Sequence, residues 1–265
     1  MPEWTSSSGF IDIAREGDAA ILRLRRPEKL NALTVPMLRD VAAGIDAAAA
    51  SSTGVVITGE GRAFSAGDDL PATEDLERTA FEELLEGFQQ ITRAIMRTEV
   101  PVLAAVNGIA VGGAAEMTLA CDSRVGWEGS DFLFPENDVG LTISNASTYL
   151  LPRLLGPRAL PIVLDARRLS GREAHALGLI DYLVDSAEAV VPRALEVLDR
   201  WTSRGLATRF HLELMRPPLD EIERALEREV SIGGKAWDSG TAREGIARFL
   251  REQETKRASR GSRPT

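Results

Sequence analysis

Apolar residues recur along the first half of the chain with two spacings, one typical of strands and one of helices. Short apolar runs rich in valine, isoleucine and alanine are typical of strands covered on both faces. Longer segments between them carry apolar residues three or four positions apart, as on one face of a helix. The predicted elements are a hairpin at 10–26, strands at 54–58, 102–106 and 122–126, and helices at 34–45, 76–98 and 112–120. This alternation predicts an α/β core.

The pattern changes after Ser144, where the chain becomes mainly helical. One amphipathic helix carries Ile222, Leu226 and Val230 on a single face. The last ten residues are polar and basic and show no apolar periodicity. We therefore divide the chain into a core at 1–200, a C-terminal helical region at 201–255 and a disordered basic tail at 256–265.

Composition and charge exclude several classes of protein. The net charge of −9 lacks the basic surplus that a broad nucleic-acid-binding surface needs. One cysteine and two distant histidines offer neither a disulfide nor a metal-ligand cluster, so we expect no metal site. Glycines and Glu116 interrupt the apolar stretch 102–120, so we expect no membrane span. The polar N-terminus lacks the apolar core of a signal peptide, which favours a cytoplasmic location.

Two glycine-containing turns follow two of the predicted strands. The first lies in residues 63–70, within a predicted loop at 59–71, and the second lies in residues 106–116. Glycine lets the backbone approach a ligand closely, and two backbone N–H groups that converge on one oxygen would form an oxyanion hole. The alternative is that both are ordinary connecting turns.

Two carboxylates lie at and beyond the second turn. Glu116 falls in a predicted apolar helix, and Glu136 follows the apolar run 132–135. Burial raises the pKa of a carboxyl group and suits it to proton transfer near neutral pH. The alternative is a buried ion pair or a position on a solvated face.

Five segments together resemble the enoyl-CoA hydratase/isomerase, or crotonase, family over about residues 10 to 252. They are 26–33 (RPEKLNAL), 63–70 (AFSAGDDL), 104–116 (AAVNGIAVGGAAE), 132–136 (FLFPE) and 172–184 (REAHALGLIDYLV). Their order and spacing match those of the family. The resemblance implies an acyl-CoA enzyme whose core is a spiral of ββα units, followed by a C-terminal helical trimerisation region at 201–255.

The resemblance also assigns residues that bind the thioester. It implies that the N–H groups of Asp68 and Gly113 form the oxyanion hole, that the carbonyl of Ala66 binds the adenine, and that residues around Lys29 flank the nucleotide. The full set of CoA-binding residues it implies is Lys29, Leu30, Ala66, Asp69, Leu70 and Gly112. It implies homotrimers or dimers of trimers. Coenzyme A would enter as part of the acyl-CoA substrate, and no permanently bound cofactor is expected.

Hydratases of the family carry two glutamates, which match Glu116 and Glu136 here, 20 positions apart. In that comparison Glu116 activates water for attack at Cβ, and Glu136 delivers a proton to Cα. The resemblance therefore implies an enoyl-CoA hydratase, a lyase that acts on a trans-2-enoyl-CoA.

The segment that would border the acyl pocket departs from the family pattern. Ile143 replaces the usual proline, and Ser144 and Ser147 replace glycines. Phe134, Ser144 and Asn145 are therefore expected to line the acyl pocket, where Ser144 or Asn145 would narrow it or bind a polar acyl group. The alternative is that Ser144 or Asn145 caps the following helix.

Two other functions stay open at the level of sequence. One is an isomerase, thioester hydrolase or carbon–carbon lyase of the same family. The other is a non-catalytic CoA-binding or scaffolding subunit, for which the altered 143–148 segment is the support. The paired glutamates argue against a non-catalytic subunit. An assay for loss of the conjugated enoyl thioester separates a hydratase from the other enzymes of the family.

Overall fold

The computed structural model describes residues 5–69 and 77–261, with side chains described as far as residue 252. Its larger sheet has six strands in the order β1-β2-β3-β5-β7-β10. β1 and β2 form an antiparallel hairpin, and the other neighbours pair in parallel. The strands are β1 (Ile11–Glu16), β2 (Ala19–Leu24), β3 (Gly54–Gly59), β5 (Val102–Val106), β7 (Ser123–Trp127) and β10 (Tyr182–Val184). The predicted hairpin and the three predicted strands are confirmed.

A smaller four-stranded sheet has the order β4-β6-β8-β9. Its strands are β4 (Ala63–Ser65), β6 (Ile109–Val111), β8 (Asp131–Leu133) and β9 (Leu169–Ser170). The chain passes three times from the larger sheet to the smaller one, from β3 to β4, β5 to β6 and β7 to β8. The prediction of a loop at 59–71 is wrong at residues 63–65, because a three-residue strand is too short to show alternation.

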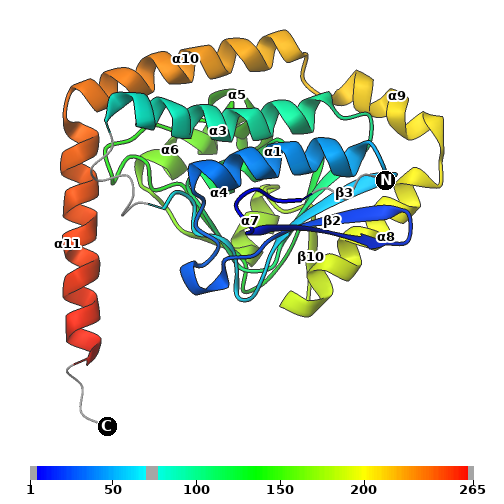
Figure 1. Cartoon of the computed structure of the whole chain (residues 1–265), viewed down its shortest axis with the longest axis horizontal. Coiled ribbons are helices and arrows are strands. Elements are labelled where there is room, and N and C mark those ends of the chain that lie inside the picture. Colours follow the sequence, from blue (N-terminus) through cyan, green and yellow to red (C-terminus); the bar gives the residue numbers. More distant parts are fainter. Residues whose placement is uncertain (1–4, 70–76, 262–265) are drawn as a thin grey trace.

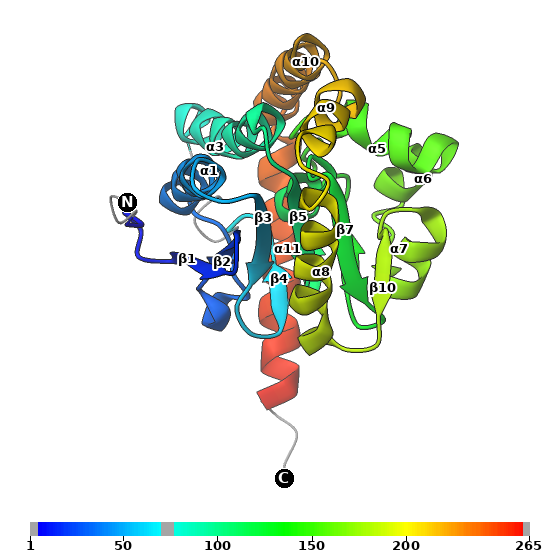
Figure 2. The same ribbon diagram turned by 90° about the vertical axis from the view of Figure 1, so that its right-hand side faces the viewer.

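Helices cover both faces of the larger sheet. α1 (Val35–Ala49), α3 (Arg78–Arg97) and α10 (Leu219–Asp238) form a layer above it (Figure 1). α8 (Val190–Thr202) packs on the other face, against β3, β5 and β7 (Figure 2). Alternate residues of β3 explain this, since Val55 and Ile57 join the main core with α1, whereas Val56 packs with α8. The α/β fold class and the C-terminal helical region are confirmed.

Four short helices lie between β6 and β10 along the chain. They are α4 (Gly113–Leu119), α5 (Ser147–Leu155), α6 (Ala159–Leu164) and α7 (Gly171–Leu177). α4 follows β6 directly and packs against α3 and α5. Because α4 begins at Gly113, the glycine turn predicted from the sequence stands between the smaller sheet and this helix.

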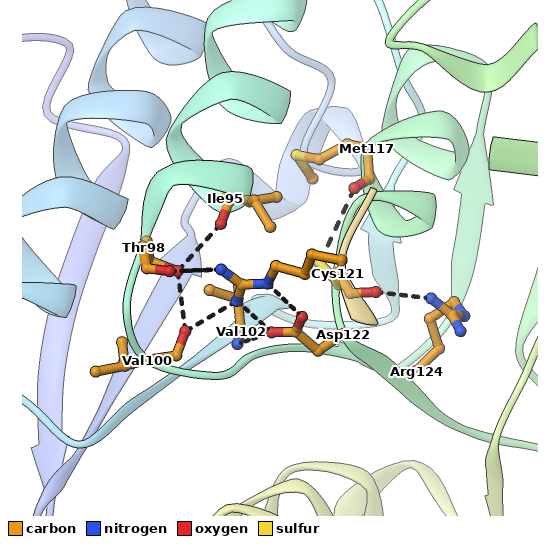
Figure 3. Close-up of polar contacts among 9 residues, drawn as sticks. Ile95, Thr98, Val100, Val102, Met117, Cys121, Asp122 and Arg124 are labelled. Atoms are coloured by element: carbon orange, nitrogen blue, oxygen red, sulfur yellow. Dashed lines mark hydrogen bonds and ion pairs between the residues drawn. The ribbon is translucent and has the colours of Figure 1, made fainter. Parts of the chain in front are cut away.

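One arginine ties the C-terminal helices to the spiral. Arg216 ends α9 (Leu206–Met215), and its guanidinium donates hydrogen bonds to the Asp122 carboxylate and to the carbonyl oxygens of Thr98 and Val100. Figure 3 shows Thr98, Val100 and Asp122 facing one another at this point. The Arg216–Asp122 pair is largely buried, so its hydrogen bonds fix where α10 starts.

The last helix, α11 (Thr241–Gly261), runs along one edge of the molecule, and its C-terminal half projects beyond the rest in both views (Figures 1 and 2). α11 includes residues 256–261 of the predicted disordered tail, and residues 262–265 lie outside the described residues. The division of the chain at residues 200 and 255 stays a prediction. No helix in the described part is long and apolar enough to cross a membrane.

Candidate active site

Two turns meet at one edge of the smaller sheet. β4 and β6 are parallel neighbours, so the turns that follow them, 66–69 and 112–113, leave the sheet on the same side. Gly67 has a φ of +81°, and a Cβ there would lie 2.4 Å from the Val111 carbonyl oxygen. Only glycine allows this approach, which brings the two turns into contact.

Each turn presents a backbone N–H group that no described protein atom accepts. In the first turn the N–H groups of Gly67 and Asp69 donate to Ser65 Oγ and the Leu33 carbonyl, whereas that of Asp68 between them has no acceptor. In the second turn Gly112 donates to the Leu133 carbonyl, and the N–H of Gly113 at the start of α4 has no acceptor. The two N–H groups predicted to form an oxyanion hole are therefore both available to a ligand.

A cavity of roughly 370 Å³ opens beside these turns. Asp68, Gly112, Gly113, Glu116, Glu136 and Ser144 line its polar part. Its other walls are mostly apolar and include Phe81, Leu85, Phe88, Val111, Leu133 and Leu141. An apolar cavity with a few converging polar groups is the usual form of a small-molecule site.

Glu116 lies in the first turn of α4 and is 1% exposed. Its carboxylate accepts hydrogen bonds from the Ser144 N–H, 3.0 Å from each oxygen, and from Ser144 Oγ at 2.7 Å. Burial, and then the charge of Glu136, raise the pKa of Glu116 well above its ordinary value, whereas the Ser144 donors act in the opposite direction. Ser144 therefore fixes the carboxylate and favours its charged form.

Glu136 follows β8 and approaches the same turn from the other side. A Cβ on Gly112 would lie 3.2 Å from Glu136 Oε1, which places this carboxyl beside the oxyanion turn. Its Oε2 atom is buried and finds no hydrogen-bond partner in the described part of the chain. Burial raises the pKa of Glu136 to about 8; its own N–H lowers that pKa, and the nearby Asp68 carboxylate raises it further. A carboxyl group with such a pKa can both hold a proton and give it up near neutral pH.

The predicted CoA-binding residues lie in different surroundings. Leu30, Ala66 and Gly112 line the cavity. Lys29 ends a short 3-10 helix and is exposed outside the cavity. Asp69 pairs with Arg26 through a hydrogen bond of 2.8 Å between Oδ2 and Nη1. Leu70 lies outside the described residues, so the structure gives no position for it.

Two residues predicted for the acyl pocket point elsewhere. Phe134 lies in the main hydrophobic core, whereas its neighbours Leu133 and Pro135 line the cavity, because successive residues of an extended segment face opposite ways. The Asn145 side chain donates a hydrogen bond to the Gly113 carbonyl at 3.0 Å and so holds the second turn in place. Ser144 lines the cavity, and its hydroxyl donates a hydrogen bond to Glu116.

Glu229 of α10 is a site residue that the sequence did not indicate. Its carboxylate accepts hydrogen bonds from the N–H of Ala146 and from the N–H and hydroxyl of Thr148, at 2.7 to 2.8 Å. The first N–H groups of a helix lack partners within it, so Glu229 caps α5 from a distant helix. Neither Ser144 nor Asn145 caps α5, which excludes the capping alternative. The sequence signal for Glu229 was a glutamate within the amphipathic pattern of the predicted helix that carries Leu226 and Val230.

Replacing Glu229 by Gln should destabilise the 144–148 segment, because one oxygen that accepts a backbone N–H becomes an NH2 group. Loss of a buried charged acceptor costs about 1–3 kcal/mol. We expect denaturant unfolding to show this loss of stability. We also expect kcat to fall, because a displaced 144–148 segment would move Ser144 away from Glu116. The exposed Glu227 of the same helix provides the matched control, Glu227→Gln. Equal unfolding midpoints for the two variants would refute the capping role.

Comparison with known proteins places this site in a family. The model of the enoyl-CoA hydratase/isomerase family matches residues 15–258. A crotonyl-CoA hydratase from Syntrophomonas wolfei is 30% identical over 251 residues, covering 92% of this chain and 96% of that protein. A probable enoyl-CoA hydratase from Rhodobacter capsulatus is 33% identical over 243 residues, covering 88% and 92%. The solved structure of an enoyl-CoA hydratase from Bacillus halodurans shares the fold, with a TM-score of 0.83 at 22% identity and coverage of 90% and 99%.

Proposed function

Since this chain belongs to the enoyl-CoA hydratase/isomerase family, we propose that it adds water across the double bond of a trans-2-enoyl-CoA. It is an enoyl-CoA hydratase-like enzyme of the lyase type that acts on acyl-CoA thioesters. One observation carries the choice of hydration within the family. Two buried carboxyl groups, Glu116 and Glu136, share one cavity with two N–H groups that lack protein acceptors.

The oxyanion hole acts on the thioester carbonyl. The N–H groups of Asp68 and Gly113 donate to its oxygen, which gains negative charge when a nucleophile attacks Cβ. Donors fixed in a water-poor cavity stabilise this charge strongly, and one such donor is typically worth about 3–4 kcal/mol. Asn145 contributes indirectly because its amide holds the Gly113 peptide in place.

The two glutamates divide the proton transfers between them. Two close carboxyl groups do not both ionise easily, so they share a proton. The Ser144 donors stabilise charge on Glu116, whereas Glu136 Oε2 has no donor, so the proton resides on Glu136. Glu116 takes a proton from water as its oxygen bonds to Cβ, and Glu136 gives its proton to Cα. The net change is the addition of one water molecule.

Coenzyme A would be held as part of the substrate by the first segment and the first turn. Leu30 and Ala66 line the cavity of the proposed site, and exposed Lys29 can reach a phosphate in solvent. Arg26 and Asp69 brace this segment through their ion pair.

The direct test is hydration of 2-butenoyl-CoA. The absorbance of the conjugated enoyl thioester should fall in proportion to enzyme, and mass spectrometry should find a product heavier by one water. A product of unchanged mass with a shifted double bond would assign the isomerase function instead. No turnover, with retained binding of the thioester, would support the non-catalytic alternative.

We propose that the chain assembles into trimers or hexamers. α9 exposes large apolar side chains that the single chain leaves uncovered, namely Leu206, Phe210, Leu214 and Met215. Light scattering at micromolar concentration should give a mass three or six times 28.7 kDa. A mass of one chain would contradict the proposal. The cytoplasmic location expected from the sequence stays a prediction.

A further inference from the structure

The side chain of Asp68 is an acidic group that the proposed hydration does not use. Only its backbone N–H takes part in the oxyanion hole. Its carboxyl group lines the same cavity, and its Oδ1 atom is shielded from solvent without a hydrogen-bond partner among the described residues. The Arg26 guanidinium forms its ion pair with the neighbouring Asp69, at 2.8 Å.

A shielded carboxylate oxygen without a donor is unfavourable, because that oxygen has lost water and gained nothing in exchange. Burial raises the pKa of Asp68 to about 6, so the group is still mainly charged at neutral pH. The apolar side chains that line the cavity with it, such as Phe88 and Val111, offer no donor, and the proton of Glu136 is the one that the proposed mechanism gives to Cα. Among the described residues no other side chain donates to Asp68 Oδ1, so the missing donor would come with the ligand.

The position of Asp68 limits where that donor can be. Its carboxyl oxygens lie within about 5 Å of its own backbone nitrogen by covalent geometry. The thioester oxygen would lie about 3 Å from that nitrogen. The donor must therefore belong to the first few carbons of the acyl chain or to the adjacent end of the pantetheine arm. The rest of the cavity, with Phe81, Leu85 and Leu141, suits a hydrocarbon tail.

We propose that Asp68 selects enoyl thioesters that carry a hydroxyl group next to the reacting double bond. The proposal rests on the hydratase function and names its substrate class. A hydroxyl supplies one neutral donor, whereas an ammonium group would be costly to desolvate among apolar walls. An acyl group with a second carboxylate is disfavoured, because it would face both Asp68 and the Glu116–Glu136 pair.

The test compares 4-hydroxy-2-butenoyl-CoA with 2-butenoyl-CoA in the full-length enzyme. The wild type should prefer the hydroxylated thioester in kcat/KM by about tenfold or more, the effect of one hydrogen bond to a charged group. Asp68→Ala keeps the backbone N–H and should bring the ratio of the two kcat/KM values close to one, and Asp68→Asn should give an intermediate ratio. Asp18→Asn removes the same charge at an exposed turn outside the cavity and should keep the wild-type preference.

The outcomes separate this proposal from the function on which it rests. If the wild type hydrates both thioesters and Asp68→Ala lowers both kcat/KM values equally, Asp68 serves the pantetheine amide or the catalytic water, and the selection of a hydroxyl is overturned. An unchanged ratio in Asp68→Ala overturns it as well. If the wild type hydrates neither thioester, the hydratase function itself has failed.

Discussion

Glu116→Gln should lower kcat for hydration by about 10²- to 10⁴-fold, the usual contribution of a general base. Glutamine can still accept a hydrogen bond from Ser144, but it cannot take a proton from water. The Ser144 donors hold the charged form of Glu116 in place, so the loss should appear in kcat while KM changes little. Initial rates over a range of thioester concentrations measure both constants.

The control for this variant is binding of a saturated acyl-CoA, which needs no proton transfer. Its affinity should match that of the wild type, since the oxyanion donors Asp68 and Gly113 are untouched. Near-normal hydration by Glu116→Gln would place water activation elsewhere in the cavity and would favour the isomerase or carbon–carbon lyase reading.

Glu136→Gln should lower hydration by a similar factor, because the proton for Cα is lost. In the wild type the group is protonated below its pKa of about 8, so activity should fall as pH rises through that value. A pH profile of kcat/KM reports this ionisation in the free enzyme. The residual activity of Glu136→Gln should lack the alkaline decline, whereas an unchanged profile would assign the decline to another group.

The same ionisation should lower the stability of the wild type as pH rises, an effect that Glu136→Gln should lack. The folded-state pKa of Glu136 lies above its ordinary value of 4.5, so the folded chain holds a proton that the unfolded chain releases as pH rises from 4.5 to about 8. Stability therefore falls across this window and is lowest above it. Glu136→Gln removes this dependence, so its melting temperature relative to the wild type should rise between pH 5 and pH 9.

The double variant Glu116→Gln/Glu136→Gln tests whether the two groups act together. Both act on one water molecule and one enoyl thioester, so the loss should be much smaller than the product of the two single losses. A multiplicative loss would mean that the two carboxyl groups serve independent steps.

The larger sheet and the long helices could be predicted from the sequence because their patterns are local. The strand predicted at 102–106 is β5, and the helix predicted at 76–98 corresponds to α3. Elements of this length repeat their apolar spacing several times, so tertiary contacts are not needed to identify them. The family resemblance added the order of the turns and both glutamates.

The smaller sheet was decided by tertiary structure. β4, β6 and β8 have three residues each, too few for an alternating pattern, and they become strands only by pairing with one another across the chain. This pairing brings the two oxyanion turns together. The sequence showed the glycines of these turns, whereas their contact depends on hydrogen bonds between strands more than 40 positions apart.

The directions of individual side chains were also beyond the sequence. It named Ser144, Asn145 and Phe134 as neighbours of the acyl group. In the folded chain the Ser144 hydroxyl donates to Glu116, the Asn145 amide donates to the Gly113 carbonyl, and Phe134 is buried in the core. Glu229 lies 83 positions from the Ala146 N–H that it binds. Sequence thus determined which acids and turns the site contains. Which donor each acid receives, and which acid receives none, depends on distant segments that meet only in the folded chain.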